Sequence, residues 1–158
     1  MKIRKAKIED LDAINKVYVS GCIDEVRLQH PEMSKGEVLK EMKRDEVERL
    51  SSFKKELKNP EYYWLVAEID GRIIGFSQAK VEKTCEKLRG FWEKVYIDKN
   101  FRKKGIGKIF GKDTINWLKK KKAKTVEGGI FIKNKPSIAL CKSLGLKPVA
   151  VRMFMELK

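Results

Sequence analysis

The chain has 158 residues, 42% of them hydrophobic and 9% aromatic, and carries a formal net charge of +15. That length suits one domain with a proper core, and the composition argues against disorder. The three cysteines are far apart without a Cys-x-x-Cys pair, and His30 is the single histidine. We therefore expect no metal site, no disulfide framework and no histidine-based nucleophile.

Two further features bear on location and partners. No apolar run approaches the roughly 20 residues of a membrane span, and Met1–Arg4 does not resemble a signal peptide. We therefore expect a cytoplasmic protein without membrane contact. The basic charge is concentrated, because Lys99–Lys124 holds eleven basic residues and one acid, Asp113. This concentration makes nucleic-acid binding one alternative to consider.

The N-terminal third predicts one short strand and two helices. Lys2–Ala6 reads as a strand, and apolar residues at helical spacing then predict a helix that ends before Pro31. Ser34 and Glu37 have the spacing of a capping box. They predict the start of a second helix, which continues to Asn59.

The middle of the chain predicts three strands. Tyr62–Ile69 and Arg72–Val81 are rich in aromatic and β-branched residues, and Asp70-Gly71 between them is typical of a hairpin turn. The polar stretch Glu82–Arg89 predicts a loop. Gly90–Ile97 predicts the next strand.

The C-terminal part predicts two helices and two more strands. One helix begins beside Gly105, and another covers Asn134–Leu144. Thr125–Ile132 predicts a strand, and alternating apolar residues predict a last strand over Val149–Leu157. The whole order indicates one α/β domain with a mixed sheet, spanning residues 1–158.

The strand ending near Ile97 leads through a basic loop to Gly105-Ile106-Gly107. Free amides and the dipole at such a helix N-terminus favour an anion, so we expect a phosphate-bearing ligand. A P-loop is excluded, since Gly111-Lys112 is followed by Asp113 and lacks the first glycine. A dinucleotide fingerprint is excluded too, because the third glycine comes one residue late.

A third template fits these residues. Arg102 to Gly107, with the sequence Arg-Lys-Lys-Gly-Ile-Gly, resembles the Gln/Arg-x-x-Gly-x-Gly/Ala motif of the GNAT acetyltransferases. Asn134 to Leu140 and Leu144-Gly145-Leu146 resemble the second signature of that family. The two signatures occur in family order, and the resemblance covers essentially the whole chain.

The resemblance implies a GNAT-like, mainly antiparallel mixed sheet of six to seven strands with about four helices, splayed near the cofactor. The cofactor would be acetyl-CoA, with its pyrophosphate on the amides of the loop and its pantetheine arm paired with the strand before it. The implied cofactor-binding residues are Val95, Tyr96, Ile97, Arg102, Lys103, Lys104, Gly105, Ile106, Gly107, Lys108, Asn134 and Ser137. The glycines would let the backbone approach the phosphates closely.

The implied reaction is direct attack of an amine on the thioester, without a metal. Glu93 is our candidate for the base, because it lies two residues before Val95 and is expected on the same strand face. The family usually has a tyrosine where this chain has Cys141. Cys141, Tyr96 or water could protonate the leaving thiolate, and Cys141 could instead only pack.

The amine-bearing acceptor is not identified by any residue. The family usually builds the acceptor side from the N-terminal helices, which here carry Asp24, Glu25 and Glu32. Acetyl transfer to a primary amine of a small molecule or protein is the favoured function. The alternatives are a coenzyme A-binding protein without turnover and, less favoured, a nucleic-acid-binding domain. A homodimer is left open.

Overall fold

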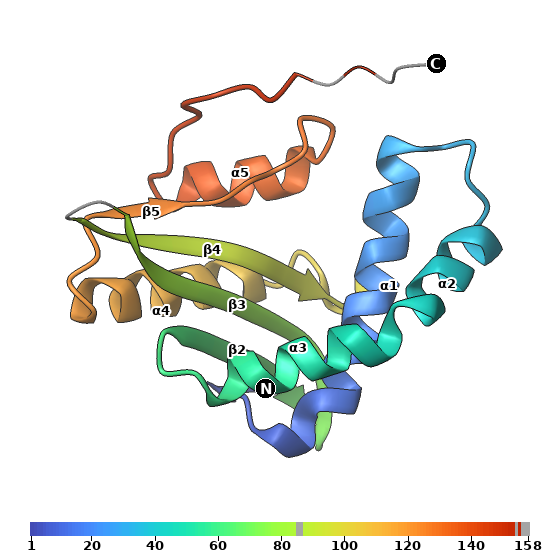
Figure 1. Cartoon of the computed structure of the whole chain (residues 1–158), viewed down its shortest axis with the longest axis horizontal. Coiled ribbons are helices and arrows are strands. Elements are labelled where there is room, and N and C mark those ends of the chain that lie inside the picture. Colours follow the sequence, from blue (N-terminus) through green and yellow to red (C-terminus); the bar gives the residue numbers. More distant parts are fainter. Residues whose placement is uncertain (85–86, 154, 156–158) are drawn as a thin grey trace.

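The computed structural model describes every residue except 85–86, 154 and 156–158. Its centre is a sheet whose five strands follow one another in chain order. Neighbours from β1 to β4 are antiparallel, and β4 and β5 are parallel. The strands are β1 (Lys2–Lys5), β2 (Tyr62–Ile69), β3 (Arg72–Thr84), β4 (Lys87–Ile97) and β5 (Thr125–Glu127). The expected mixed, mainly antiparallel sheet is therefore confirmed (Figure 1).

The expected six to seven strands are wrong, since the described residues form five. The strand predicted at Thr125–Ile132 ends at Glu127. Residues 149–153 and 155 lie outside the sheet, and Leu157 lies outside the described residues. Alternating apolar residues make a strand only where a neighbouring strand pairs with them, and the sequence alone does not show that none of the described strands pairs with this segment.

The two hairpins of the sheet differ in how well the sequence predicts them. Asp70 and Gly71 form the predicted turn, with φ of 49° and 76°, and Ile69 faces Arg72 across it. The loop predicted at Glu82–Arg89 is instead a hairpin, in which Thr84 still pairs with Lys87. Its sequence is polar because the two paired strands are mostly exposed here, so neither face has to present apolar side chains to a core.

Among the described residues, five α-helices surround the sheet, one more than expected. They are α1 (Leu11–Gln29), α2 (Lys35–Arg44), α3 (Glu46–Lys58), α4 (Ile106–Lys120) and α5 (Lys135–Ser143), with short 3₁₀ turns η1 (Ile8–Asp10) and η2 (Lys99–Phe101). The capping box of Ser34 and Glu37 at the start of α2 is confirmed. Within the described residues, no helix has the length and apolarity needed to cross a membrane.

The extra helix arises because the helix predicted up to Asn59 breaks at Asp45. Buried Asn15 of α1 donates to Glu46 at 2.7 Å and accepts from Arg49 at 2.9 Å. Arg49 also donates to the carbonyl of Met42, near the end of α2. Contacts from a distant helix therefore stabilise the break, and no local glycine or proline signals it.

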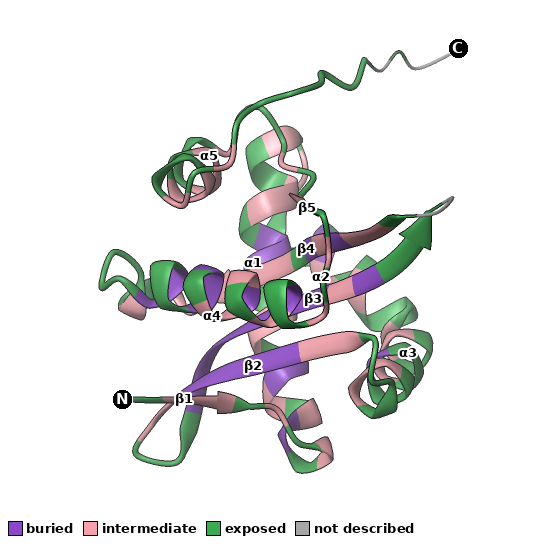
Figure 2. Ribbon diagram, turned by 90° about the vertical axis from the view of Figure 1, so that its left-hand side faces the viewer, coloured by how far each residue is buried: buried purple, intermediate pink, exposed green. Residues whose placement is uncertain are grey.

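Each face of the sheet carries its own core. The first, here called the α4-face core, includes Leu65, Ile74, Ala79, Trp92, Ile106 and Phe110. The second, called the α1-face core, includes Ile14, Phe53, Trp64, Val66, Ile73 and Phe76. Figure 2 shows these buried residues along the middle of the sheet and on the inner sides of the helices. Strand β4 contacts α1 on one face and α4 on the other.

Candidate functional site

Strand β4 has an open edge. Strand β5 pairs only with Arg89, Gly90 and Phe91. From Trp92 to Ile97, no described strand lies on that side of β4. The sheet is therefore splayed beside the end of β4, as expected.

Backbone groups of β4 face this opening. The amide of Asp98 donates to the carbonyl of Ile74 on β3 at 2.8 Å. Along a strand, the backbone N–H and C=O groups of alternate residues point to opposite edges. Because the Asp98 amide points to β3, the N–H and C=O groups of Val95 and Ile97 point to the other, open edge of β4. The Ile97 carbonyl accepts a bond from Arg102 Nε at 2.9 Å. An extended ligand would find backbone donors and acceptors here.

The start of α4 lies next along the chain and carries unpaired amides. Gly105 is the N-cap, with φ of 80°, and Lys103 has φ of 61°. None of the amides of residues 103–108 donates to another group among the described residues. Six free donors and the positive end of a 15-residue helix form a site suited to an anion.

The two glycines of the motif have different roles. A Cβ on Gly105 would meet nothing within 4 Å, so its value lies in the left-handed backbone. A Cβ on Gly107 would meet Leu140 of α5 at 3.0 Å. Gly107 is buried, so its missing side chain also allows α4 to pack closely against α5.

The basic side chains around the motif are mostly exposed. Arg102 is held, because its second guanidinium nitrogen donates to Asp24 of α1 at 2.6 Å. Lys104 lies over the ring of Phe101 at 5.1 Å. Lys103 and Lys108 are exposed. The positive charge therefore surrounds the free amides, with one arginine fixed toward α1.

Helix α5 brings the second signature beside the end of α1. Asn134 is the N-cap of α5 and accepts from the amide of Ser137 at 3.2 Å. Lys133 Nζ donates to the carbonyl of Gln29 at 3.3 Å. Asn134 therefore contacts the neighbouring backbone at the start of α5.

Cys141 lies on the inner side of α5. It is half-buried and packs against the α4-face core together with Leu140 and Leu144. Burial raises the pKa of the Cys141 thiol. This environment is that of a packing residue, which keeps its proton at neutral pH.

The side chain of Tyr96 lies on the α1 side of β4, against the α1-face core. Its hydroxyl donates to Glu25 of α1 at 2.7 Å and accepts from Cys22 at 3.6 Å. Burial is the main cause of a strongly raised pKa for Tyr96, with nearby Cys22 and Glu25 adding to it. The phenol is therefore neutral and already engaged with α1.

Glu93 does not share a face with Val95, and that expectation is wrong. A β-bulge between Gln78 and Ala79 shifts the register, so that Gln78 faces Lys94 and Ala79 faces Trp92. The Glu93 carboxylate accepts from Gln78 at 3.0 Å and pairs with Lys80 at 3.2 Å. An extra residue at a bulge reverses the simple alternation, and sequence gave no sign of it.

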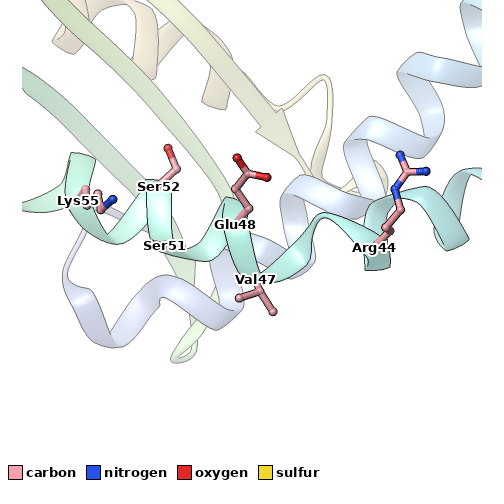
Figure 3. A pocket seen from close by; sticks show the side chains of 6 residues that line it. All are labelled: Arg44, Val47, Glu48, Ser51, Ser52 and Lys55. Carbon is pink, nitrogen blue, oxygen red and sulfur yellow. The ribbon is translucent and has the colours of Figure 1, made fainter.

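One hollow of the described surface lies away from these residues. It measures about 600 Å³ and lies on α3 and the end of α2 (Figure 3). Its lining residues are Arg44, Val47, Glu48, Ser51, Ser52 and Lys55. None of them belongs to the candidate site, which is an open edge and a helix end.

A sequence model of the acetyltransferase (GNAT) family matches residues 26–146. The chain belongs to the GNAT family. The match includes the open edge of β4, the start of α4 and both signatures, so the residues that carried the resemblance lie inside it.

Solved structures share this GNAT fold. A mutant of the BH1408 protein from Bacillus halodurans aligns over 100% of both chains with TM-score 0.78 and 17% identity. The aminoglycoside N-acetyltransferase AAC(6')-Iy in complex with CoA aligns over 99% of both chains, with TM-score 0.68 and 17% identity. The aminoglycoside acetyltransferase meta-AAC0020, from an uncultured soil metagenomic sample and in complex with sisomicin, has TM-score 0.68 and 19% identity, covering 99% of this chain and 96% of its own.

Two side chains near the candidate site were not singled out from the sequence as partners. Gln78 is fully buried on β3 and donates to Glu93. Glu25 was noted only as one acid of the N-terminal helices, yet it holds Tyr96. A polar residue inside a buried strand was the available signal for Gln78.

Proposed function

We propose that this chain, acting as one domain over residues 1–158, transfers the acetyl group of acetyl-CoA to a primary amine. The observation that carries the proposal is the set of six free amides at the start of α4, directly beside the open edge of β4. A phosphate group on the amides and an extended arm on the edge correspond to the two ends of coenzyme A. Membership of the GNAT family supports the same donor.

In this proposal the pyrophosphate binds the amides from Lys103 to Lys108, and the surrounding lysines neutralise its charge. Arg102 contributes its backbone to the phosphate site, or its guanidinium group leaves Asp24 and binds the phosphate. The pantetheine arm pairs with Val95 and Ile97 like an added strand, passing Tyr96 between them. Asn134 and Ser137 form the side of the arm's path at the start of α5.

The reaction would take place at the open edge of β4. The amine nitrogen attacks the thioester carbon, and the Ile97 amide stabilises the developing oxyanion, an interaction worth roughly 3 kcal/mol. Glu93 receives the amine proton; it lies two residues beyond Phe91, the last residue of β4 paired with β5. The carbon–sulfur bond then breaks and releases the coenzyme A thiolate.

The thiolate needs a proton, and the contacts of Cys141 and Tyr96 indicate whether either can donate it. Cys141 is packed and Tyr96 donates to Glu25, so neither offers a free proton in this arrangement. We therefore assign that proton to water. Because the Tyr96 hydroxyl donates to the Glu25 carboxylate, the role of this pair in the proposal is to hold α1 against β4.

The acceptor amine would approach from the side of α1. Asp24 and Glu25 of that helix lie next to the loop and to β4, through their bonds to Arg102 and Tyr96. Carboxylates there favour an acceptor that carries more than one positive charge. The relatives whose structures contain CoA or sisomicin are aminoglycoside acetyltransferases, which supports amines of this kind.

A second candidate function is coenzyme A binding without turnover. It is favoured by Cys141, which stands where the GNAT family usually has tyrosine and is packed into the core. Binding and turnover differ in one measurement: acetyl-CoA binds in both cases, but free coenzyme A thiol is released with an amine only in the first.

The donor site is tested by Gly105→Asp, which places a carboxylate among the free amides. Calorimetry should show acetyl-CoA affinity lowered by at least a hundredfold, since the anion is repelled and the amides are obstructed. The matched control is Gly71→Asp, because Gly71 has φ of 76° against 80° at Gly105 and neither Cβ would meet an atom within 4 Å. Equal affinities in the two variants would contradict the placement.

Turnover is tested by thiol release from acetyl-CoA against a panel of mono- and polyamines, aminoglycosides and peptides. We expect release with amines bearing several positive charges. Tight acetyl-CoA binding with no release for any acceptor would instead favour the non-catalytic candidate.

A further inference from the structure

Gln78 is a fully buried amide in the middle of strand β3. Its relative exposure is 0%, and Trp64 of the α1-face core lies opposite it on β2. A buried amide is costly unless its polar atoms find partners, and a leucine of similar size would fill the same space without that requirement. The partners of Gln78 therefore indicate what the amide does.

The hydrogen bonds described for this amide all join it to charged side chains. The amide nitrogen donates to the Glu93 carboxylate at 3.0 Å and lies 3.5 Å from the carboxylate of Glu56 on α3. The amide oxygen accepts from Lys94 Nζ at 3.3 Å. Because a cation faces the oxygen and carboxylates face the nitrogen, the amide is held in one of its two orientations, with its N–H groups toward Glu93.

Glu93 is the residue that regular strand pairing does not hold. It is the extra residue of the β-bulge in β4, so it has no opposite residue on β3. On the other side of β4, pairing with β5 ends at Phe91. The side-chain contacts of Glu93 therefore decide where its carboxylate lies.

Two close contacts hold this carboxylate, and they differ in rigidity. One oxygen of Glu93 pairs with Lys80 Nζ at 3.2 Å, but Lys80 has a long side chain and also pairs with Glu82 at 3.2 Å. The other oxygen accepts from Gln78 and lies 4.0 Å from Lys94 Nζ. Close packing leaves the buried Gln78 little rotamer freedom, so it restrains the carboxylate more strongly than the shared lysine does.

We infer that Gln78 is a positioning residue, whose amide holds the Glu93 carboxylate in place to receive the proton of the acceptor amine. The inference rests on the proposed function, in which Glu93 is the base. A carboxylate can accept about four hydrogen bonds, so the contacts with Gln78 and Lys80 leave room for that proton. Lys94 acts one step further away, by orienting the amide of Gln78.

The variant Gln78→Leu removes the amide and keeps a side chain of similar size. We expect kcat for thiol release to fall about tenfold, because displacing a reacting group by about 1 Å can cost as much as about a hundredfold. The KM for the amine should stay at its native value, as should the calorimetric affinity and stoichiometry for acetyl-CoA. Native stoichiometry would show that the lower kcat is not caused by an unfolded fraction.

The matched control is Ser77→Ala, at the neighbouring position of β3, where Ser77 is 1% exposed. The Ser77 hydroxyl accepts from Trp92 Nε1 at 2.8 Å, so the control also removes a buried hydrogen bond but leaves Glu93 untouched. It should keep the native kcat, and urea unfolding shows how much stability each variant loses. Equal kcat values in the two variants would overturn the inference.

A second pair of variants leaves the buried amide in place. Lys94→Met removes the donor that orients Gln78 and should lower kcat, although by less than Gln78→Leu does. Lys94→Arg keeps a donor and should restore kcat. A native kcat in Lys94→Met would contradict the orienting role of Lys94.

A double-mutant cycle shows whether Gln78 acts through Glu93. In a chain that already carries Glu93→Gln, the change Gln78→Leu should cause no further loss of kcat. An equal loss in both backgrounds would refute the inference, since the amide would then act independently of Glu93. Failure of the proposed function gives a different result, because the native chain itself would then bind no acetyl-CoA or release no thiol, and the inference would fall with it.

Discussion

The two sides of β4 are built in different ways. On the α4 side, the anion site is made of backbone groups between Ile97 and Lys108, all close in sequence. On the α1 side, the site is made of side chains that meet from distant elements, such as Tyr96 with Glu25 and Glu93 with Gln78. In the proposed function, the difference teaches that the cofactor site is local in sequence, whereas the acceptor side depends on tertiary contacts.

The largest expected effect tests whether the α1 side carries the chemistry. Glu93→Gln should lower kcat by roughly a hundredfold or more, because a positioned base contributes about 10²–10⁴-fold, while calorimetric acetyl-CoA affinity stays unchanged. Glu82→Gln is the matched control, since Glu82 and Glu93 both pair with Lys80 at 3.2 Å. Equal activity of the two variants would reduce Glu93 to an ion-pair partner.

The next effect concerns how tightly α1 is fitted to β4. A Cβ on Gly21 would overlap the ring of Tyr96. We expect Gly21→Ala to lower the free energy of unfolding by about 2 kcal/mol, since overpacking costs about 3 and alanine restores about 1 of helix propensity.

Urea unfolding measures this change. The control Gly36→Ala, on α2, has no atom closer than 3.8 Å and should gain about 0.5–1 kcal/mol. A gain of similar size in both variants would mean that α1 can move away from Tyr96 freely.

A smaller effect compares one tyrosine from each face. Tyr96→Phe removes the bond to Glu25 and should cost about 1.5 kcal/mol of stability, since a carboxylate loses its donor. Tyr63 of the α4-face core reaches Asp113 at only 3.4 Å, so Tyr63→Phe should cost no more than about 0.5 kcal/mol. Chemical denaturation of both variants checks this order, and the reverse order would show that the Glu25 contact adds nothing.

The smallest effect is expected at Cys141. Cys141→Ser should retain kcat within about threefold, because the thiol packs rather than reacts. Burial raises the thiol pKa, so the group stays neutral at neutral pH and its titration should leave no step between pH 7 and 8 in the rate profile. A loss of several orders of magnitude in the serine variant would restore Cys141 as the proton donor.

The fold was largely predictable because most of its signals are local. The turn at Asp70-Gly71, the capping box at Ser34 and the start of α4 beside Gly105 each depend on a few adjacent residues. The break at Asp45 was not predictable, since its stabilising contacts come from Asn15 on another helix. The prediction of a last strand at Val149–Leu157 was wrong for the same reason, because the alternating pattern of a segment does not show whether another strand pairs with it.

In the candidate site, too, the local features were predictable and those that depend on tertiary contacts were not. The positions of the free amides and the open edge followed from the motif at Arg102 to Gly107 and the strand before it. The face of Glu93 did not, because a bulge opposite Gln78 reverses it. The roles of the predicted cofactor and catalytic residues remain predictions for the experiments above.

The order of the strands also bears on how the protein folds. Strands β2, β3 and β4 are successive antiparallel neighbours, so they pair over short distances along the chain. Strand β5 pairs in parallel and has to wait for the crossover through α4. We therefore expect the meander of β2, β3 and β4 to form before β5 docks. The opening beside β4 lies at that later junction, so the region that would receive ligand is formed after the meander.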